Sequence, residues 1–318
     1  MRKIGLVFAA VILLGGSATA QDWPPASAVR VMVPFAAGGP VDVPARLMNE
    51  RLGAQTKGTF ILENRGGAGG TIGAQVVAQA PPDGTSLLFT TSSIAIAPAL
   101  YPTLTFDPLQ FTPISLIADV PIVLAVRGNS PIRTLTEFLA KAKAEPGKIT
   151  FGSGGVGSGN HLAGEQLKTM AGINLLHVPY RGMAPGMTAL YAGDINSVFS
   201  STIEALAPGR DGRIRILGVC SPTRLPELPD VPAIAELVPG YSTANWYGLF
   251  GPRGLPQGIV ARLERELATM RSHELMVART SAAGIALKLS GAELLRERMA
   301  AEVPRWKRIA ADLKLRAD

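Results

Sequence analysis

The stretch VMVPFAAGGPVDVPAR (residues 31–46) decides how the rest of the chain is interpreted. It begins as a Val-rich apolar run, passes through Gly38 and Gly39, and continues as an amphipathic run to residue 52. Asp42 suits the N-cap of a helix there, and Pro44 suits its first turn. The pattern predicts a strand, a glycine loop and a helix, with free N–H groups of both glycines forming an anion-binding concavity. The same pattern also fits a tight βα connection that binds nothing.

Composition places the chain among globular proteins. Its 318 residues are 47% hydrophobic and 17% charged, which argues against disorder and leaves room for about two domains. The formal net charge is +7, and +5 once Arg2 and Lys3 are removed with the leader described next. The basic residues are dispersed, so nothing predicts a nucleic-acid-binding surface.

The N-terminus has the pattern of a secretory signal peptide. Arg2 and Lys3 precede an apolar run over residues 4–14, and Ala18-Thr-Ala20 is a small-residue cleavage site. We expect cleavage after Ala20, a mature chain from Gln21, and an exported, soluble protein with no later membrane span. Cys220 is the single cysteine, which excludes an intramolecular disulfide and a thiolate metal site, and we expect it to be a buried, inert thiol.

The remaining chain repeats one plan, in which a short strand leads into a Gly or Ser loop and then a helix. Strands are expected at 59–62, 86–89, 148–151, 175–178, 195–199 and 214–220, with the final part of the chain helical. We interpret residues 114–126, an apolar stretch broken by Asp119 and Pro121, as a crossing between domains, and residues 247–250 as the return strand. The predicted division is residues 21–120 with 244–318 as domain 1 and 121–243 as domain 2, and we expect the tail to pack on domain 1.

Enzyme motifs are weak or absent. GSGGVG (residues 152–157) matches the dinucleotide fingerprint, but no acidic residue follows the next strand to bind a ribose. A small anion at the helix start, capped by Ser158, fits better. The sequence has neither a G-x-S-x-G elbow nor an H-E-x-x-H motif, so we expect no catalytic residues, no metal site and no cofactor.

A few polar side chains at loop mouths are candidates for ligand contact. His161 follows the second glycine loop and fits either a ligand donor or a loop cap, whereas His177 fits a satisfied core histidine. Tyr180 and Arg181 end a strand and suit a carboxylate, although Arg181 also fits a surface or inter-domain ion pair. Trp246 and its neighbouring tyrosines fit packing under a hinge, or the wall of a cleft.

Together these motifs resemble the Bug family, the periplasmic substrate-binding proteins of tripartite tricarboxylate transporters. The resemblance runs from about residue 30 to 253 and more weakly to the end of the chain. It rests on VPFAAGGPVDVPAR (33–46), ENRGGAGGTIG (63–73), PDG (82–84), GSGGVGS (152–158), HLAGE (161–165), HVPYRG (177–182), LPDVP (228–232) and WYGLF (246–250).

The resemblance implies a periplasmic binding protein type II fold, a Venus flytrap of two α/β domains around a hinge and central cleft. It implies no enzyme activity, a monomer, and two partners: a small organic carboxylate and the membrane subunits of the transporter. The substrate-binding residues that it implies, with Ser201 added at the end of the strand over 195–199, are Phe35, Gly38, Gly39, Asp42, Ser92, Ser153, Ser158, His161, Tyr180, Arg181 and Ser201.

The sequence departs from the family pattern at Thr85, where members often have Tyr, and at the shortened run DPLQF (107–111). No acidic residue stands at Ser200-Ser201, where members that recognise an amino group tend to offer one, so we favour a plain carboxylate. Two other classes of function stay open: a ligand sensor for a signalling partner, and an exported hydrolase or nucleotide-dependent enzyme.

Overall fold

The computed structural model describes residues 23–180, 182–282, 284–312 and 315–316. The predicted signal peptide, its cleavage site after Ala20, and Arg181 lie outside these described residues. Within the same ranges, no helix combines the length and the apolar character needed to cross a membrane.

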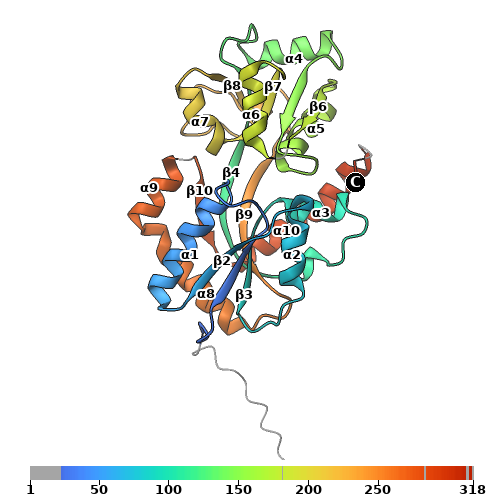
Figure 1. Cartoon of the computed structure of the whole chain (residues 1–318). Helices are drawn as coiled ribbons and strands as arrows, with labels where there is room; N and C mark the ends of the chain where they lie inside the picture. Colours follow the sequence, from blue (N-terminus) through green and yellow to red (C-terminus); the bar gives the residue numbers. More distant parts are fainter. Residues whose placement is uncertain (1–22, 181, 283, 313–314, 317–318) are drawn as a thin grey trace, which may run out of the picture.

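The chain folds into two α/β lobes connected by two long strands (Figure 1). The lower lobe in Figure 1 is entered through β1 (Val29–Val33), α1 (Asp42–Thr56), β2 (Phe60–Asn64), η2 (Ala68–Gly70), α2 (Thr71–Ala78), β3 (Ser86–Thr91), α3 (Ser93–Leu100) and η3 (Pro108–Gln110). After β4 (Thr112–Arg127) the upper lobe contains α4 (Leu135–Ala144), β5 (Thr150–Ser153), α5 (Gly159–Ala171), β6 (Leu176–Pro179), α6 (Met183–Ala192), β7 (Ser197–Ser201), α7 (Thr202–Arg210), β8 (Ile214–Val219) and η4 (Ile234–Glu236). The chain returns through β9 (Ala244–Gly251) and ends with α8 (Gln257–Thr269), η5 (Met270–Ser272), α9 (Glu274–Ala282), β10 (Ala286–Ser290) and α10 (Ala292–Asp312).

The strands follow the order β2-β1-β3-β9-β4-β7-β5-β6, and β8 and β10 each pair with β4. β1 pairs in parallel with β2 and β3, and β5 pairs in parallel with β6 and β7. The predicted alternation of strands and helices is therefore confirmed in both lobes. The carboxyl ends of these parallel strands, where ligands bind in open α/β sheets, point toward the gap between the lobes.

The crossing strand β4 is one continuous strand that runs through Asp119 and Pro121, the two residues that interrupt its apolar sequence. Its first part pairs with β9 as far as Pro121, and its second part pairs with β7 and β8 from Ile122 onward. The strand accommodates Asp119 because its carboxylate is paired: Arg298 Nη1 lies 2.6 Å from Oδ1, and Lys288 Nζ lies 3.6 Å from Oδ2. The change of partner lies beside the predicted crossing near residue 120, while the exact domain division stays a prediction.

Two elements were not expected from the sequence. β10, within the tail predicted to be helical, pairs antiparallel with β4 as a short edge strand. Helix α7 was missed because Pro208 and Gly209 interrupt the helical pattern near its end. Other ends were predicted correctly: Gly172 and Gly193 close α5 and α6 with φ of +62° and +88°.

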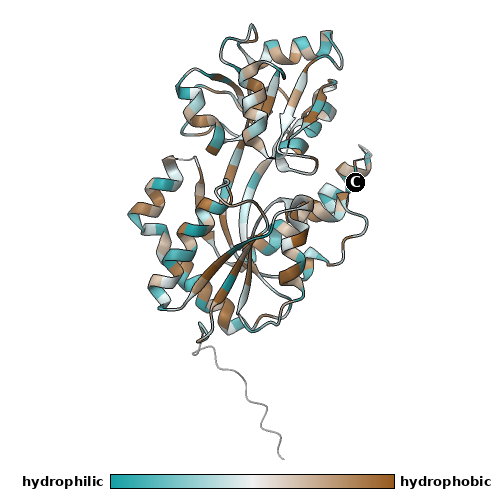
Figure 2. Cartoon of the chain, in the orientation of Figure 1, coloured by the Kyte–Doolittle hydropathy of each residue, from teal (hydrophilic) through white to brown (hydrophobic). Residues whose placement is uncertain are grey.

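Each lobe has its own apolar core. The buried side chains of β1, β3, β4 and β9 face α1 and α8 on one side and α2, α3 and α10 on the other, and Figure 2 shows strands of the lower lobe largely in brown, the colour of hydrophobic residues. In the tail, α10 packs against α3 of the first lobe. In the second lobe Cys220 is fully buried, as predicted, and burial raises the pKa of its thiol to about 12.

The return strand β9 places its aromatic residues in different environments. Trp246 is buried, and its Nε1 donates to the Glu302 carboxylate of α10 at 2.9 and 3.0 Å. Tyr247 borders the gap between the lobes, and its hydroxyl donates to the Pro40 carbonyl at 3.0 Å. Trp246 therefore has a packing role under the crossing strands, whereas Tyr247 forms part of the cleft wall.

Candidate functional site

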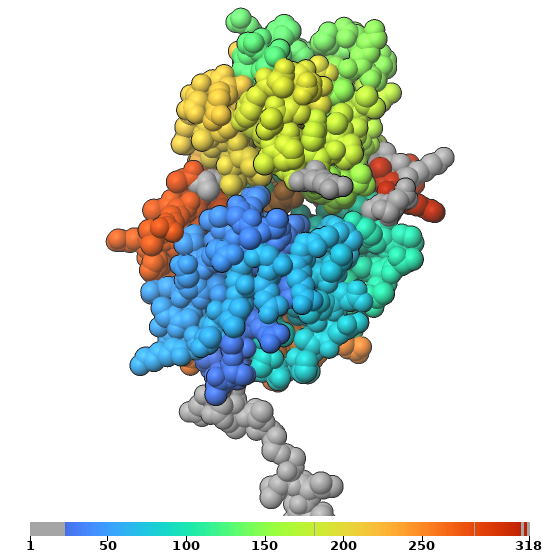
Figure 3. Space-filling view, viewed as in Figure 1, coloured from blue at the N-terminus to red at the C-terminus, as the bar shows by residue number. Residues whose placement is uncertain are grey.

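A cleft of about 650 Å³ lies between the lobes. Figure 3 shows the surface hollowed there, between the blue and cyan lower lobe and the green and yellow upper lobe. Its walls come from the loops after β1, β2 and β3 in one lobe, the loops after β5, β6 and β7 in the other, and β9 between them. Both lobes therefore contribute to one cavity through loops that follow strands.

The first glycine loop, residues 38–40, is held by Asp42, the first residue of α1. One oxygen of its carboxylate accepts from the Gly38 N–H at 2.9 Å and from Arg46 Nε at 2.7 Å, and the other accepts from Asn64 at 2.9 Å. Burial raises the pKa of Asp42, but the donors from Arg46, Gly38 and Asn64 outweigh it and hold the pKa below its ordinary value. Asp42 therefore shapes the loop as an ion.

Two expectations for this loop are wrong. Asp42 is not the N-cap, because Val41 precedes the helix and no side chain caps it. The N–H groups of Gly38 and Gly39 are not free, because they donate to Asp42 and, at 3.4 Å, to the Ala36 carbonyl. Both glycines border a neighbouring chamber instead of the cleft.

A different glycine segment, residues 66–70, faces the cleft from this lobe. It leads into α2, whose N-cap Gly70 has φ of +96° and no side-chain cap. The backbone of Gly66 packs beside Phe35, which also lines the cleft. The run of glycines between a strand and a helix was the signal for this segment, although none of its residues was among the candidates.

The second glycine loop, residues 154–159, forms the facing wall. Ser158 is the N-cap of α5, as predicted: its Oγ accepts from the His161 N–H at 3.2 Å and donates to the Gly155 carbonyl at 2.8 Å. The buried Ser153 hydroxyl hydrogen-bonds Gly155 at 3.2 Å from behind the loop. The loop is therefore held by serine side chains, and its backbone forms the cleft wall.

Two stacked histidines support the same loop from inside the lobe. Their rings lie 4.0 Å apart; His161 Nδ1 accepts from the Gly157 N–H at 3.2 Å, and His177 Nε2 lies 2.7 Å from Ser153 Oγ. Burial lowers the pKa of His161 to about 3 and of His177 to about 4. Both rings are neutral near pH 7, and His161 lies behind the wall rather than in the cleft.

The end of β3 and the start of α7 complete the cleft. Ser92 is buried behind the wall, where its Oγ donates to Asn245 Oδ1 at 3.0 Å, while Thr91 and Ser93 line the cavity. Ser201 lines the cavity beside Glu204, whose carboxylate accepts from the Ser201 N–H at 3.2 Å.

Of the ten predicted residues that the structure describes, three reach the cleft: Phe35, Ser158 and Ser201. Tyr180 is half-buried and packs within the second lobe, and Arg181 lies outside the described residues. Sequence reasoning missed Glu204, the one carboxyl group among the described lining residues. No Lys, Arg or His side chain lines the cleft among these residues, and the described part of the chain has no cluster of three or more acidic, His or Cys side chains that could hold a metal ion.

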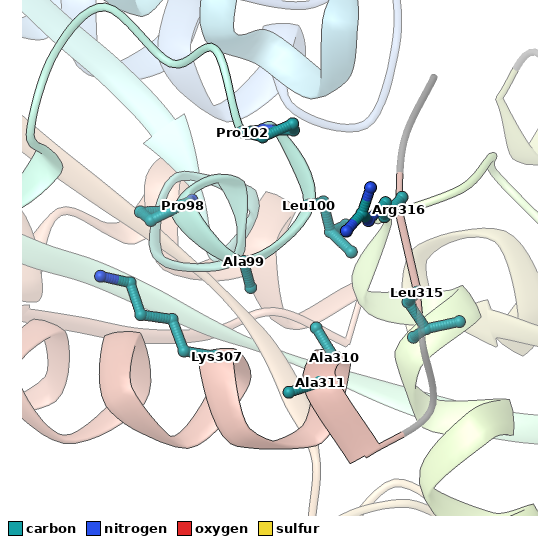
Figure 4. A pocket seen from close by; sticks show the side chains of 9 residues that line it. All are labelled: Pro98, Ala99, Leu100, Pro102, Lys307, Ala310, Ala311, Leu315 and Arg316. Carbon is teal, nitrogen blue, oxygen red and sulfur yellow. The ribbon is translucent and has the colours of Figure 1, made fainter.

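A cavity of about 680 Å³ on the outer side of the first lobe is a poorer candidate site (Figure 4). It lies between α3 and the C-terminal segment, with Lys307 and Arg316 as its basic residues. Figure 4 shows these two side chains on opposite sides of the cavity, so they do not converge on one anion.

The comparisons with known proteins agree with the two-lobe architecture. The family profile described as TctC, tripartite tricarboxylate transporter family receptor, matches residues 44–315. The periplasmic binding protein BugD is 32% identical, with 91% of this chain and 99% of its own covered, and a TM-score of 0.82.

Two similar structures contain carboxylates. An R. palustris protein solved with adipate is 33% identical, with 91% of this chain and 98% of its own covered, and a TM-score of 0.83. MatC from Rhodopseudomonas palustris with bound malate is 30% identical, with 90% and 99% covered, and a TM-score of 0.81. The predicted periplasmic binding protein fold is thereby confirmed, and these similar proteins are solute-binding proteins, not enzymes.

Proposed function

Because this chain belongs to the TctC family of tripartite tricarboxylate transporter receptors, we propose that it captures a small organic carboxylate between its lobes and delivers it to the membrane subunits of such a transporter. The two similar proteins that contain adipate and malate support a carboxylate as the ligand. The observation that carries the proposal is the cleft itself, in which glycine segments from opposite lobes face one cavity at the starts of α2 and α5.

Backbone N–H groups at helix starts suit a carboxylate. The N-terminus of a helix carries partial positive charge and unpaired N–H groups, and glycines let the backbone approach an anion closely. We therefore assign these backbone groups as donors to the carboxylate. Among side chains, we assign direct contacts to Phe35, Ser158 and Ser201.

Domain closure follows from the position of the cleft. A ligand held by both glycine segments makes its full set of contacts only when the lobes are close, so binding shifts the population toward a closed form. We propose that β4 and β9 form the hinge near residues 120 and 244, and that the closed, monomeric form docks on the transporter. We also propose that the protein is exported to the periplasm and that its signal peptide is cleaved after Ala20. N-terminal sequencing of the exported protein would check the cleavage site.

Thermal-shift screening of the purified protein tests the ligand class. Dicarboxylates, tricarboxylates, aromatic acids and amino acids form the test panel, and neutral sugars and amine cations form the control panel. We expect carboxylates to raise the melting temperature, since a ligand at a hundred times its Kd adds about 2.7 kcal/mol of stability. Stabilisation only by sugars or cations would show that the carboxylate assignment is wrong.

A further inference from the structure

An apolar chamber of about 270 Å³ adjoins the cleft on the side of the first glycine loop. It lies where α1, α7 and α9 meet, and the apolar side chains that line it are Pro40, Val43, Pro44, Leu47, Ile203 and Ile285. At about 30 Å³ per water molecule in the liquid, its volume corresponds to about nine waters. The chamber can therefore hold several methylene groups.

The chamber and the cleft share two wall residues, Pro40 and Glu204. The Pro40 carbonyl is fixed by the Tyr247 hydroxyl, so the loop between the two cavities has a defined position. In Figure 1, α1, α7 and α9 lie on one side of the gap between the lobes, whereas α2 and α5 lie on the other. The cleft therefore has a glycine-rich end and an end that leads toward the chamber.

The two ends differ in what they offer an anion, because the start of α7, which also lies at the cleft, already holds the Glu204 carboxyl. The starts of α2 and α5 favour an anion at the glycine-rich end. At the other end, one oxygen of the Glu204 carboxyl accepts hydrogen bonds from Ser200 Oγ at 3.4 Å and from both the N–H and the hydroxyl of Ser201. A second carboxylate at this end is disfavoured, because moving a charged group out of water and against the apolar wall of the chamber is costly.

Resting on the proposed function, we propose that the ligand is a monocarboxylate with an apolar tail: its carboxylate lies at the glycine segments, and its tail passes between Pro40 and Glu204 into the chamber. Burial of the Glu204 carboxyl raises its pKa, which favours the neutral form of this carboxyl beside the apolar tail. The chamber wall also contains Arg279, which is exposed on α9. Water around that guanidinium weakens its attraction for a distant second carboxylate.

Calorimetric titration with acetate, butanoate, hexanoate and octanoate tests the tail. Each methylene group that enters the chamber should lower Kd by up to about fourfold. Adipate has the same chain length as hexanoate but a second carboxylate, which would lie near Glu204, and we expect it to bind about tenfold more weakly than hexanoate. Adipate binding as tightly as hexanoate would overturn the proposed polarity of the cleft.

The variant Val43→Asn tests the chamber directly, with Leu275→Asn as a matched control. Each is the second residue of its helix and is 52% exposed, so neither change empties a core position, but only Val43 lines the chamber. We expect Val43→Asn to flatten the dependence of Kd on chain length while acetate binding is unchanged. Leu275→Asn should leave the whole series unchanged.

The outcomes separate the two proposals. A series in which short carboxylates bind but longer chains bring no gain, or in which Val43→Asn keeps the full gain, overturns the apolar tail and leaves the proposed function intact. If the protein binds no carboxylate in the series or in the wider panel, both the apolar tail and the proposed function are wrong.

Discussion

Gly159, the first residue of α5, offers a quantitative test of how the upper lobe meets β9. A Cβ atom on this residue would lie 1.9 Å from Asn245 Oδ1 and 2.9 Å from its Cγ, closer than real Cβ atoms approach other groups. The Asn245 side chain cannot move away without cost, because its Oδ1 accepts the hydrogen bond from Ser92 at 3.0 Å. Gly159→Ala must therefore move this side chain or displace the start of α5.

The cost can be worked out from these contacts. Loss of the Ser92 hydrogen bond costs about 1 kcal/mol, and a displaced rotamer costs about 1 kcal/mol more. Helix propensity offsets up to about 1 kcal/mol of this, because Ala is a better helix former than Gly. A double-mutant cycle with Asn245→Ala removes the propensity term, and we expect a coupling energy of about 2 kcal/mol.

Urea unfolding of the wild type, both single variants and the double variant measures this coupling. We expect Asn245→Ala to restore part of the stability that Gly159→Ala loses, since the smaller side chain leaves room for the new Cβ. Free energies that add within about 0.5 kcal/mol would refute the close contact.

Three further predictions concern the paired histidines, Asp42 and Arg181. The pKa values of His161 and His177 in the folded protein lie below the ordinary 6.5, so the unfolded chain binds more protons than the folded protein below that pH. The free energy of unfolding is therefore highest above pH 6.5 and decreases as the pH falls toward 4 for His177 and 3 for His161. The decrease is up to about 1.4 kcal/mol per pH unit for each ring. Unfolding between pH 7 and 5 measures this slope. His161→Gln should reduce it, and a flat profile in the wild type would contradict it. Asp42→Asn weakens three hydrogen bonds to a buried carboxylate, so we expect a loss of about 3 kcal/mol of unfolding free energy, and a loss under 1 kcal/mol would show that the carboxylate does not hold the loop. Arg181→Ala should raise Kd for a carboxylate more than about tenfold if the guanidinium pairs with it, and an unchanged Kd in calorimetry would assign Arg181 a structural role.

The general architecture was predictable because its signals are local. Strands, glycine loops and helices alternate along the chain with clear apolar patterns, and this alternation is sufficient to predict parallel sheets and a cleft at their carboxyl ends. The N-cap role of Ser158 was predictable for the same reason, since it depends only on the residues that follow it.

The details that failed depend on contacts between distant residues. Gly38 was expected to offer a free N–H, but its partner Asp42 is oriented by Asn64, the last residue of a different strand, β2. His161 was placed near the ligand by its sequence position, whereas the stack with His177 holds it behind the loop. Glu204 was missed together with α7, because a carboxyl group on an unpredicted helix could not be placed at the cleft.

Small-angle X-ray scattering of the mature protein, with and without a saturating carboxylate chosen by thermal shift, tests the central claim most directly. A carboxylate that bridges the glycine segments of both lobes should reduce the radius of gyration, because it stabilises the form in which the lobes are close. The neutral sugars of the control panel should leave the scattering unchanged. A carboxylate that saturates the protein with no decrease in the radius of gyration would contradict capture by closure of the two lobes.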